Sequence, residues 1–384
     1  MTGEHATTQT MERARTLLAL NLGSSTLKAA WFELHSHGTN APGFTAMART
    51  SLDLEGAPEH WLAQVVDALD VHVAPDVVAH RVVHGGEAGT ARRLDAAEMA
   101  RLHALAGLAP LHQPQALALA RNAAVRWPGA TACGVYDTAW HAGLPPVSRR
   151  LPVPASWDAL GVKRYGFHGL AFASGMRLLD QARPRTSAGR IVLAHLGGGS
   201  SLCAVHDGRS IDTTMAMTPL DGLPMASRSG SLDPGVLLFL LRRGGLDLDE
   251  LEQALYRDCG MRGISGLSGD VRDLLQADTP GTRLALGQYM LRVAQGIAGL
   301  AASLGGLDDL AFSGGIGANS AVVRAGVIAH LEWLGLCLDA AANARNAMDI
   351  GSPESRYRMW CIHVDEESEI ARACLACIVG TRAA

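Results

Sequence analysis

Length, composition and charge indicate a globular protein with more than one domain. The chain has 384 residues, more than a single core usually organises, and its content of 48% hydrophobic and 18% charged residues is typical of a well-buried protein. A net charge of −4, with no run of basic residues interleaved with aromatic ones, argues against nucleic acid as the main partner. No stretch is apolar enough for a bilayer span, so we expect no membrane association.

The first strong pattern is a turn of glycine and serine between two apolar runs. Residues 18–31 read LALNLGSSTLKAAW, which predicts a β-hairpin. A turn without bulky side chains lets backbone N–H groups approach an anion closely, and hydroxyl groups add further donors. One such turn is weak evidence, since most turns of this composition are only turns.

Helical and strand patterns alternate after this hairpin, which is typical of a largely parallel sheet covered by helices. Two polar residues, His84 and Asp137, come directly after predicted strands, where open α/β sheets place their ligands. The predicted elements are helices over 61–70, 95–108 and 115–125 and strands over 76–83 and 132–136.

The hairpin pattern occurs a second time, half a chain later. A proline-rich stretch, 144–157, predicts a linker, and residues 191–205 then read IVLAHLGGGSSLCAV. A return strand is expected at 210–214. Two matched turns indicate a duplicated domain that grips phosphate from both sides.

The rest of the chain adds helices and one more glycine-rich turn. Ser313–Asn319 reads SGGIGAN, follows a predicted strand and opens a helix, a pattern that suits phosphate at a helix N-terminus. The other predicted elements are helices over 234–243, 248–256, 271–276, 282–304 and 367–379 and strands over 309–312 and 358–363.

Seven cysteines in a large chain without a secretory pattern favour a reducing cytoplasm. Cys374 and Cys377 have C-x-x-C spacing. They lie on the apolar face of a predicted helix without a second pair, so core packing is favoured over redox or zinc chemistry.

Three basic residues are candidates for binding an anion. Arg81 lies in a buried-looking strand and Arg228 in the segment ASRSG, where an arginine is costly unless an anion accompanies it. An internal salt bridge is an equally good interpretation of either one alone. His168, in RYGFHG, would by itself be read as a satisfied core histidine.

Taken together, the motifs resemble those of the acetate kinases. The resemblance runs from about Leu17 to Arg372, and TTMAMTPLDGLPMASRSGSLDPG is too long and unusual for chance. The other motifs, in the order of that family, are NLGSSTLK, HRVVHGGE, LAPLHQP, YDTAWH, RYGFHG, GISGLSGDVRD, SGGIGAN and VDEESEIAR.

This resemblance implies an α/β fold of the actin-like ATPase superfamily. Two duplicated ribonuclease H-like βββαβαβα domains would flank a nucleotide cleft. We expect an N-terminal domain over 16–146 and a C-terminal domain over 147–365 with the nucleotide-binding segments. A last helix, 366–384, would pack back onto the N-terminal domain.

The resemblance also implies the reaction. ATP would pass its γ-phosphoryl group to acetate by direct in-line transfer, reversibly, giving acetyl phosphate and ADP. Such a transfer needs positioning and charge neutralisation more than covalent catalysis. Arg81 would hold the substrate carboxylate, while His168 and Arg228 would neutralise the transferring phosphoryl group. Asp137 matches the family's catalytic aspartate, acting through a metal-bound water or an arginine.

The remaining site residues follow from the same motifs. Asn21 and Glu366 match the positions associated with Mg²⁺, for which Mn²⁺ is the alternative, and a hard ion of this kind keeps most of its waters. The positions that match nucleotide contacts are Lys28, His195, Leu196, Gly197, Gly198, Gly199, Asp270, Val271, Arg272, Gly315, Ile316, Gly317, Ala318 and Asn319.

Two departures from the family affect the nucleotide side. Gly198 stands where the family has asparagine, and Ala318 stands where it has glutamate.

Two alternatives to an acetate kinase are open. One is a propionate or butyrate kinase with the same machinery, since one methylene changes the binding free energy by only about 1–3 kcal/mol. The other is a nucleotide-binding protein without turnover. The resemblance further implies a homodimer formed through the second domain.

Overall fold

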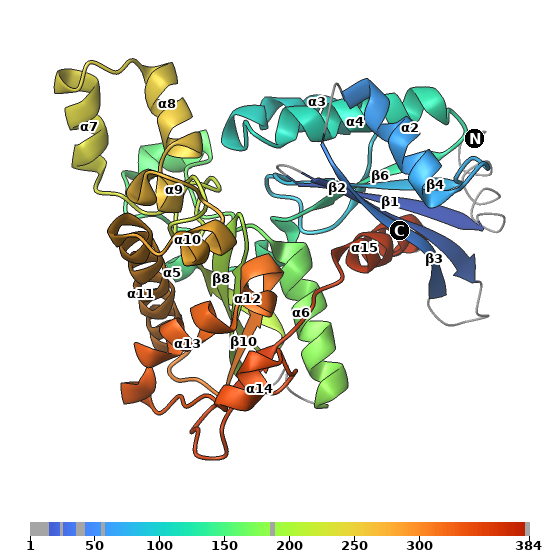
Figure 1. Cartoon of the computed structure of the whole chain (residues 1–384). Coiled ribbons are helices and arrows are strands. Elements are labelled where there is room, and N and C mark those ends of the chain that lie inside the picture. Colours follow the sequence, from blue (N-terminus) through green and yellow to red (C-terminus); the bar gives the residue numbers. More distant parts are fainter. Residues whose placement is uncertain (1–14, 24–25, 36–42, 55–57, 185–188, 381–384) are drawn as a thin grey trace. The chain divides into compact units, whose positions relative to one another are not determined.

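The chain folds into two compact units. The computed structural model describes residues 15–23, 26–35, 43–54, 58–184 and 189–380 (Figure 1). The first unit contains residues 1–142 and 365–384, and the second contains residues 143–364. None of the described helices is long and apolar enough to cross a bilayer.

The first unit is built on a mixed six-stranded sheet of order β3-β2-β1-β4-β6-β5. The first hairpin is confirmed, since β1 pairs antiparallel with β2, and β2 pairs with β3 in the same way. In contrast, β1, β4 and β6 are parallel, so their carboxyl ends share one edge. The strands are β1 (Thr16–Leu22), β2 (Thr26–His35), β3 (Gly43–Asp53), β4 (Val77–Val82), β5 (Arg92–Arg93) and β6 (Thr131–Tyr136).

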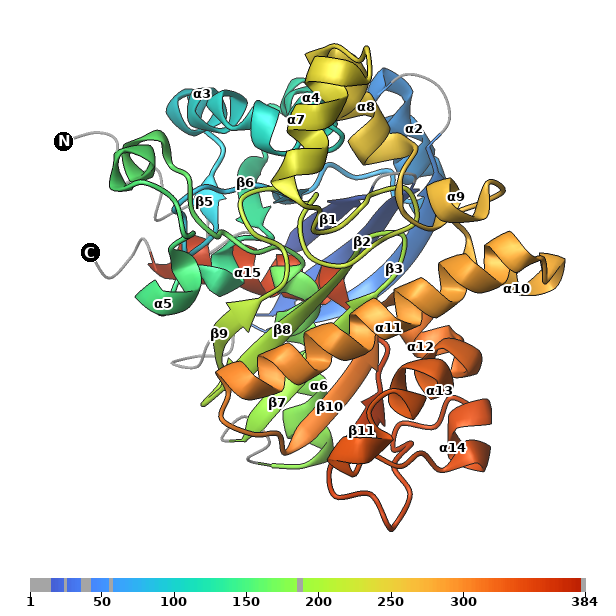
Figure 2. The same cartoon turned by 90° about the vertical axis from the view of Figure 1, so that its left-hand side faces the viewer.

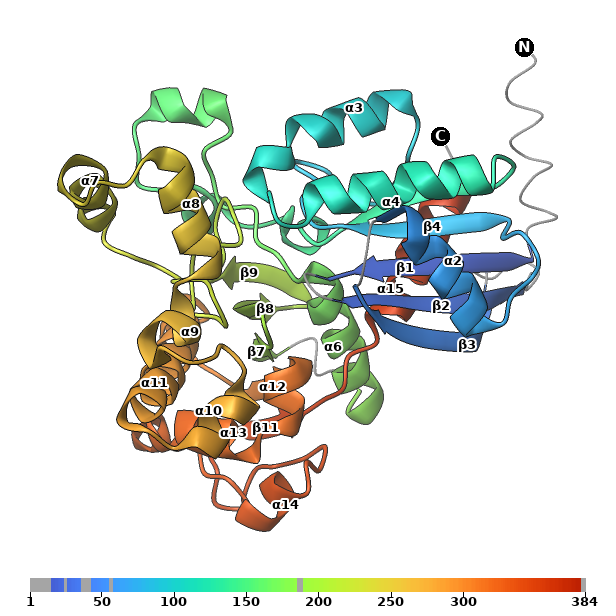
Figure 3. The same ribbon diagram turned by 45° about the horizontal axis from the view of Figure 1, so that its top comes forward.

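Helices cover both faces of this sheet. On one face lie α2 (Pro58–Leu69) and α4 (Gln113–Arg126), which bury the apolar side chains of β1 together with Trp61 and Leu119. Figure 3 shows α4 running along the strands. The other face is covered by α15 (Glu366–Gly380), which packs against β1, β2, β4 and β6 (Figure 1). Next to α4 lie α3 (Ala96–Ala104) and the 3₁₀ turn η1 (Ala106–Leu108).

The sheet of the second unit repeats the first. Its order is β11-β10-β7-β8-β9, so β9-β8-β7-β10-β11 corresponds to β3-β2-β1-β4-β6 with the same strand directions. The duplication inferred from the two hairpins is therefore confirmed. The strands are β7 (Arg190–Leu196), β8 (Ser200–His206), β9 (Arg209–Thr213), β10 (Asp309–Ser313) and β11 (Arg358–Cys361).

The core of the second unit lies between its sheet and α11 (Pro280–Ser303), the long helix that crosses β7, β8 and β9 in Figure 2. Tyr289 and Val293 of α11 are fully buried there against Val192 and Leu202. The helix α6 (Gly169–Ala182) packs on β7 and β10. The other helices of this unit are α5 (Pro146–Arg149), α7 (Pro234–Arg243), α8 (Leu248–Arg257), α9 (Gly260–Ser265), α10 (Val271–Ala277), α12 (Gly314–Asn319), α13 (Ala321–Ala329) and α14 (Ala340–Ala344). It also contains the 3₁₀ turns η3 (Ala155–Leu160) and η5 (Glu332–Leu334), whereas the 3₁₀ turn η2 (Ala139–His141) belongs to the first unit.

The chain crosses between the two units twice. The strand β6 belongs to the first unit, but α6, the next long helix, packs on the sheet of the second. The chain returns after β11, because α15 covers the sheet of the first unit.

The proline-rich stretch 144–157, predicted to be a linker, has regular structure of its own. It contains α5 and the beginning of η3. Pro146 occupies the first turn of α5, where the fixed φ of proline favours a helix and its missing N–H costs nothing.

Candidate functional site

Polar side chains gather at the carboxyl ends of the parallel strands of the first unit. Arg81, next to last in β4, donates from Nε and Nη2 to the two carboxylate oxygens of Asp137, at 2.9 and 2.6 Å. Asp137 directly follows β6 and is 1% exposed. Nη1 of Arg81 donates to Oδ1 of Asn21 in β1, at 3.1 Å. Three predicted residues from three strands therefore form one hydrogen-bonded group.

The beginning of α15 adds carboxylates to this group. Nδ2 of Asn21 donates to Oε2 of Glu366 at 3.0 Å and to Oε1 of Glu367 at 2.6 Å. Acidic side chains are favoured at a helix N-terminus by the helix dipole. The adjacent Asp365 accepts two hydrogen bonds from Arg49 of β3. Sequence reasoning found Glu366 but missed Glu367, although it is the next residue.

The donor set fits the hard ion that the family resemblance implies. Asn21 and Glu366 offer an amide and a carboxylate oxygen, which Mg²⁺ prefers, and Mg²⁺ usually binds through one or two carboxylates while retaining waters. No cluster of three or more histidine, cysteine or acidic side chains suited to a metal occurs among the described residues. The oxygens present therefore suit a weakly held, largely hydrated Mg²⁺ rather than an all-protein cage.

Electrostatics keep Arg81 charged. Burial opposes its charge, but the ion pair and hydrogen bonds with Asp137, with the charges of Glu366 and Glu367, raise the pKa of Arg81 above its usual value. The side chain is 12% exposed, and all three of its nitrogens donate to Asp137, Asn21 or the Leu22 carbonyl. Such a group can bind a carboxylate without first losing a proton.

Lys28 lies beside this group. It is exposed and pairs with Asn21 across the β1–β2 ladder, so both side chains lie on the same face of the sheet. The turn between them closes tightly, since the Gly23 N–H donates to the Thr26 carbonyl at 2.8 Å. Ser24 and Ser25, the expected hydroxyl donors, lie outside the described residues.

In the second unit the glycine turn lies against two of the predicted catalytic residues. A Cβ atom at Gly199 would lie 2.8 Å from Nη2 of Arg228 and 3.3 Å from Nε2 of His168. His168 has a φ of 58°, a left-handed conformation that is uncommon outside glycine. Its Nδ1 is 2.9 Å from Oγ of Ser201, so Nε2 points at the turn.

Arg228 is a buried cation. It is 7% exposed, and Nη1 donates to the carbonyl of Pro219 at 3.0 Å. Burial lowers its pKa to about 10, which leaves it charged at neutral pH. Within the described part of the chain it forms no ion pair with a carboxylate. A buried guanidinium that no carboxylate neutralises, beside a turn of small residues, is suited to an anion.

A cavity of about 860 Å³ opens next to this turn. This volume is within the range of small-molecule sites. The lining residues that sequence reasoning missed are Ala226, Ser227, Arg262, Gly269, Leu275 and Ser320, although ASRSG, which contains the first two, was singled out. The predicted nucleotide-binding residues that line the cavity are Gly197, Gly198, Asp270, Val271, Arg272, Gly315, Ile316 and Asn319.

Other predicted nucleotide-binding residues lie outside the lining. The side chains of Leu196 and Ala318 are buried in the core of the second unit. The Gly317 carbonyl accepts a hydrogen bond from the buried Arg324. His195 stands 4.8 Å from His168 between ring centroids, and its Nδ1 is 3.2 Å from Oγ of Ser313. Ala318 therefore replaces the family's glutamate at a position that here faces the core.

The comparisons with known proteins agree on one family. The Acetokinase family model matches residues 53–372. An acetate kinase of Methylocella silvestris is 44% identical over 304 residues, covering 78% of this chain and 75% of the relative. One from Rhodopseudomonas palustris is 40% identical over 384 residues, covering 93% and 96%.

Solved structures add the fold. A propionate kinase from Francisella tularensis has a TM-score of 0.83 at 30% identity, over 93% of this chain and 98% of that one. The acetate kinase of Porphyromonas gingivalis has a TM-score of 0.79 at 29% identity, over 95% and 100%. The two repeated sheets are thus the duplicated actin-like domains expected from the sequence. The chain belongs to the acetate kinase family of ATP-dependent phosphotransferases that act on a carboxylate.

Proposed function

We propose that this chain transfers the γ-phosphoryl group of ATP to acetate, reversibly, giving acetyl phosphate and ADP. The observation that carries the proposal is the buried, unneutralised guanidinium of Arg228 beside the glycine turn and Nε2 of His168. A transferring phosphoryl group carries charge on its equatorial oxygens, and a preorganised cation and a hydrogen-bond donor stabilise that charge.

Arg81 and Asp137 serve the acceptor in this proposal. Acetate is itself the nucleophile, so the step needs no strong base. The Arg81 guanidinium binds the acetate carboxylate and orients one oxygen for attack on the γ-phosphorus. Asp137 holds Arg81 through two hydrogen bonds and helps to fix the plane of the guanidinium. Removing the carboxylate of Asp137 would leave only the hydrogen bonds from Nη1 to Asn21 and Leu22 to hold that plane.

The metal and the nucleotide complete the scheme. Asn21 and Glu366 would hold a hydrated Mg²⁺ or Mn²⁺, which when bound neutralises phosphate charge. The 860 Å³ cavity receives ATP, with Gly197, Gly198 and the start of α12 on the phosphate side. Lys28 contributes a mobile positive charge from β2. His195, Leu196, Gly199, Gly317 and Ala318 belong to the same proposed contact set, through backbone groups where the side chain is buried.

A propionate kinase is the second candidate. The structure from Francisella tularensis bears that name, and one methylene changes binding by only about 1–3 kcal/mol. The deciding experiment offers Mg-ATP with acetate, propionate or butyrate and traps acyl phosphate with hydroxylamine. We expect hydroxamate with acetate at the highest kcat/KM. A clear preference for propionate would replace the acetate assignment, and no product with any acid would indicate a nucleotide-binding protein without turnover.

The assembly and domain limits are part of the proposal. We propose domains over 16–146, 147–365 and 366–384, a cytoplasmic location and a homodimer formed through the second domain. The helix α7 supports the last point, because it is rich in leucine and phenylalanine yet none of its residues is buried. Leu238 and Phe239 are 51% and 63% exposed, and apolar exposure of this kind is typical of an interface.

A further inference from the structure

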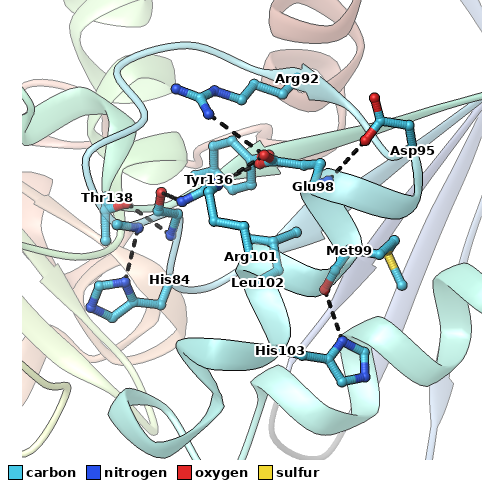
Figure 4. A network of polar contacts seen from close by, with 12 residues as sticks. His84, Arg92, Asp95, Glu98, Met99, Arg101, Leu102, His103, Tyr136 and Thr138 are labelled. Carbon is cyan, nitrogen blue, oxygen red and sulfur yellow. Dashed lines mark hydrogen bonds and ion pairs between the residues drawn. The ribbon is translucent and has the colours of Figure 1, made fainter.

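A buried polar network lies next to the Arg81–Asp137 pair of the first unit. We call Glu98, Arg101 and Tyr136, with the backbone of Gly85 and the hydroxyl of Thr138, the Glu98 network. Figure 4 shows the carboxylate of Glu98 beside the phenol of Tyr136, with Arg101 below them, Arg92 above them, and Thr138 and His84 at the left. None of these side chains is part of the catalytic set proposed above.

The contacts form a continuous chain. Oε2 of Glu98 accepts from Nε of Arg101 at 2.8 Å, and Oε1 accepts from the Tyr136 hydroxyl at 2.5 Å. Arg101 then donates from Nη1 to the Gly85 carbonyl at 2.8 Å. The Gly85 N–H donates to Oγ1 of Thr138 at 3.1 Å. The network therefore joins α3, the loop after β4 and the residues after β6.

The carboxylate of Glu98 is ionised at neutral pH. Glu98 is 7% exposed, and the hydrogen bonds from Arg101 lower its pKa to about 2, aided by Tyr136 and the charge of Arg92. A buried carboxylate is tolerated only when its lone pairs are satisfied, as they are here. The ionisation of Glu98, and with it the geometry of the network, therefore does not change with pH near neutrality.

The network holds the same two strand ends that carry the Arg81–Asp137 pair. Tyr136 and Thr138 flank Asp137 in the sequence, and Gly85 follows the strand that contains Arg81. The Gly85 backbone packs closely against Tyr136, since a Cβ atom there would be only 2.3 Å from Cγ of the tyrosine. A shift of either loop would therefore move one partner of the ion pair relative to the other.

We infer that Glu98, Arg101 and the Tyr136 hydroxyl are positioning residues for acyl phosphate formation, acting through Arg81 and Asp137. The inference rests on the roles proposed for those two residues. The expected defect concerns the acceptor, because the network borders the residues that hold the carboxylate and lies in the other unit from the 860 Å³ cavity. A displacement of about 1 Å, caused by a change far from the reacting groups, can reduce the rate by about 100-fold.

The test uses Glu98→Gln, which removes the charge, and Tyr136→Phe, which removes one oxygen and keeps the ring against Gly85. We expect kcat/KM for acetate to fall about tenfold, with KM for Mg-ATP within about twofold of normal. The matched control is Asp308→Asn, which breaks the two-point pair with Arg190 in the second unit. A general loss of stability would affect control and test variants alike, whereas a positioning role raises KM for acetate only in the network variants.

The outcomes separate this inference from the proposed function. Normal acetate kinetics in folded Tyr136→Phe and Glu98→Gln would overturn the positioning role. The proposed function would still stand if the unmodified chain produced hydroxamate and Arg81→Ala did not. No hydroxamate from the unmodified chain, or full activity of Arg81→Ala, would overturn the function itself. If Glu98→Gln does not fold, Tyr136→Phe decides alone, and Arg101→Lys should retain part of the acetate affinity.

Discussion

Gly199 and Arg228 approach so closely that no side chain fits between them. A Cβ atom at Gly199 would lie 2.8 Å from Nη2 of Arg228, whereas a Cβ atom at the neighbouring Gly198 would have no atom within 4 Å. Two adjacent glycines of the same turn thus have different reasons for being glycine. Gly199 lets the Arg228 cation lie next to the backbone, and Gly198 leaves space open on the side of the cavity.

This difference gives the first prediction. Gly199→Ala should displace the Arg228 guanidinium and reduce kcat by about tenfold or more, because groups that stabilise a transition state must be preorganised. Gly198→Ala is the control and should retain near-normal kcat, with any effect limited to KM for ATP. Equal turnover of the two variants in the hydroxamate assay would contradict the arrangement described for this turn.

The second prediction concerns the charge of Arg228. Arg228→Met should lower kcat by about 100-fold or more, since a charge clamp on the phosphoryl group is lost. Its Tm should stay the same or rise, because an unneutralised buried cation is replaced by an apolar side chain of similar length. Thermal unfolding and the hydroxamate assay measure the two effects. Near-normal turnover would show that Arg228 does not act on the phosphoryl group.

His80 predicts a loss of stability in acid. It is 1% exposed, neither ring nitrogen has a hydrogen-bond partner among the residues that the structure describes, and burial lowers its pKa to about 4. As the pH falls below about 6.5, the His80 imidazole binds a proton in the unfolded chain, whereas in the folded chain it binds one only near pH 4. The free energy of unfolding should therefore fall by about 2 kcal/mol between pH 7 and pH 5 through this residue alone.

Urea unfolding of His80→Leu measures that contribution. The variant should lose about 2 kcal/mol less than the unmodified chain between pH 7 and pH 5. His206→Gln, at an exposed histidine, serves as the control. An identical pH dependence of the unmodified chain and His80→Leu would mean that His80 is not the group responsible.

The exposed face of α7 gives the fourth prediction. Phe239→Asp should convert the proposed dimer into a monomer in light scattering after size-exclusion chromatography, because a charge would be buried in an apolar contact. Val125→Asp is the control, since Val125 is 83% exposed on α4 of the first unit. A dimer that survives Phe239→Asp would place the interface elsewhere, and a monomeric unmodified chain would refute the homodimer.

Local signals explain what the sequence could predict. Both hairpins were found because apolar runs flank a glycine turn, and Arg81 and Asp137 because a polar residue stands near the end of a buried strand. In contrast, β3 was missed because none of its residues is buried and its alternating, partly buried positions include small or polar residues such as Ala48 and Thr50. The helix α6 was also missed, because its apolar run follows a glycine and proline-rich region without a capping signal.

Contacts between distant segments explain what it could not predict. Glu98 reads as an ordinary acidic residue in the first turn of a helix, and only the approach of α3 to Tyr136 shows that it is buried. Ala318 looked like a change in the nucleotide site, yet its side chain lies in the core. The direction of a side chain in a short helix such as α12 depends on packing that the motif does not contain.

The return of the chain into the first unit has a consequence for synthesis. Glu366 and the helix that covers one face of the first sheet are synthesised after the strands of both sheets. A chain that stops before Glu366 therefore lacks that helix and the carboxylates beside Asn21. Residues from opposite parts of the sequence must both be present before the group around Arg81 is complete.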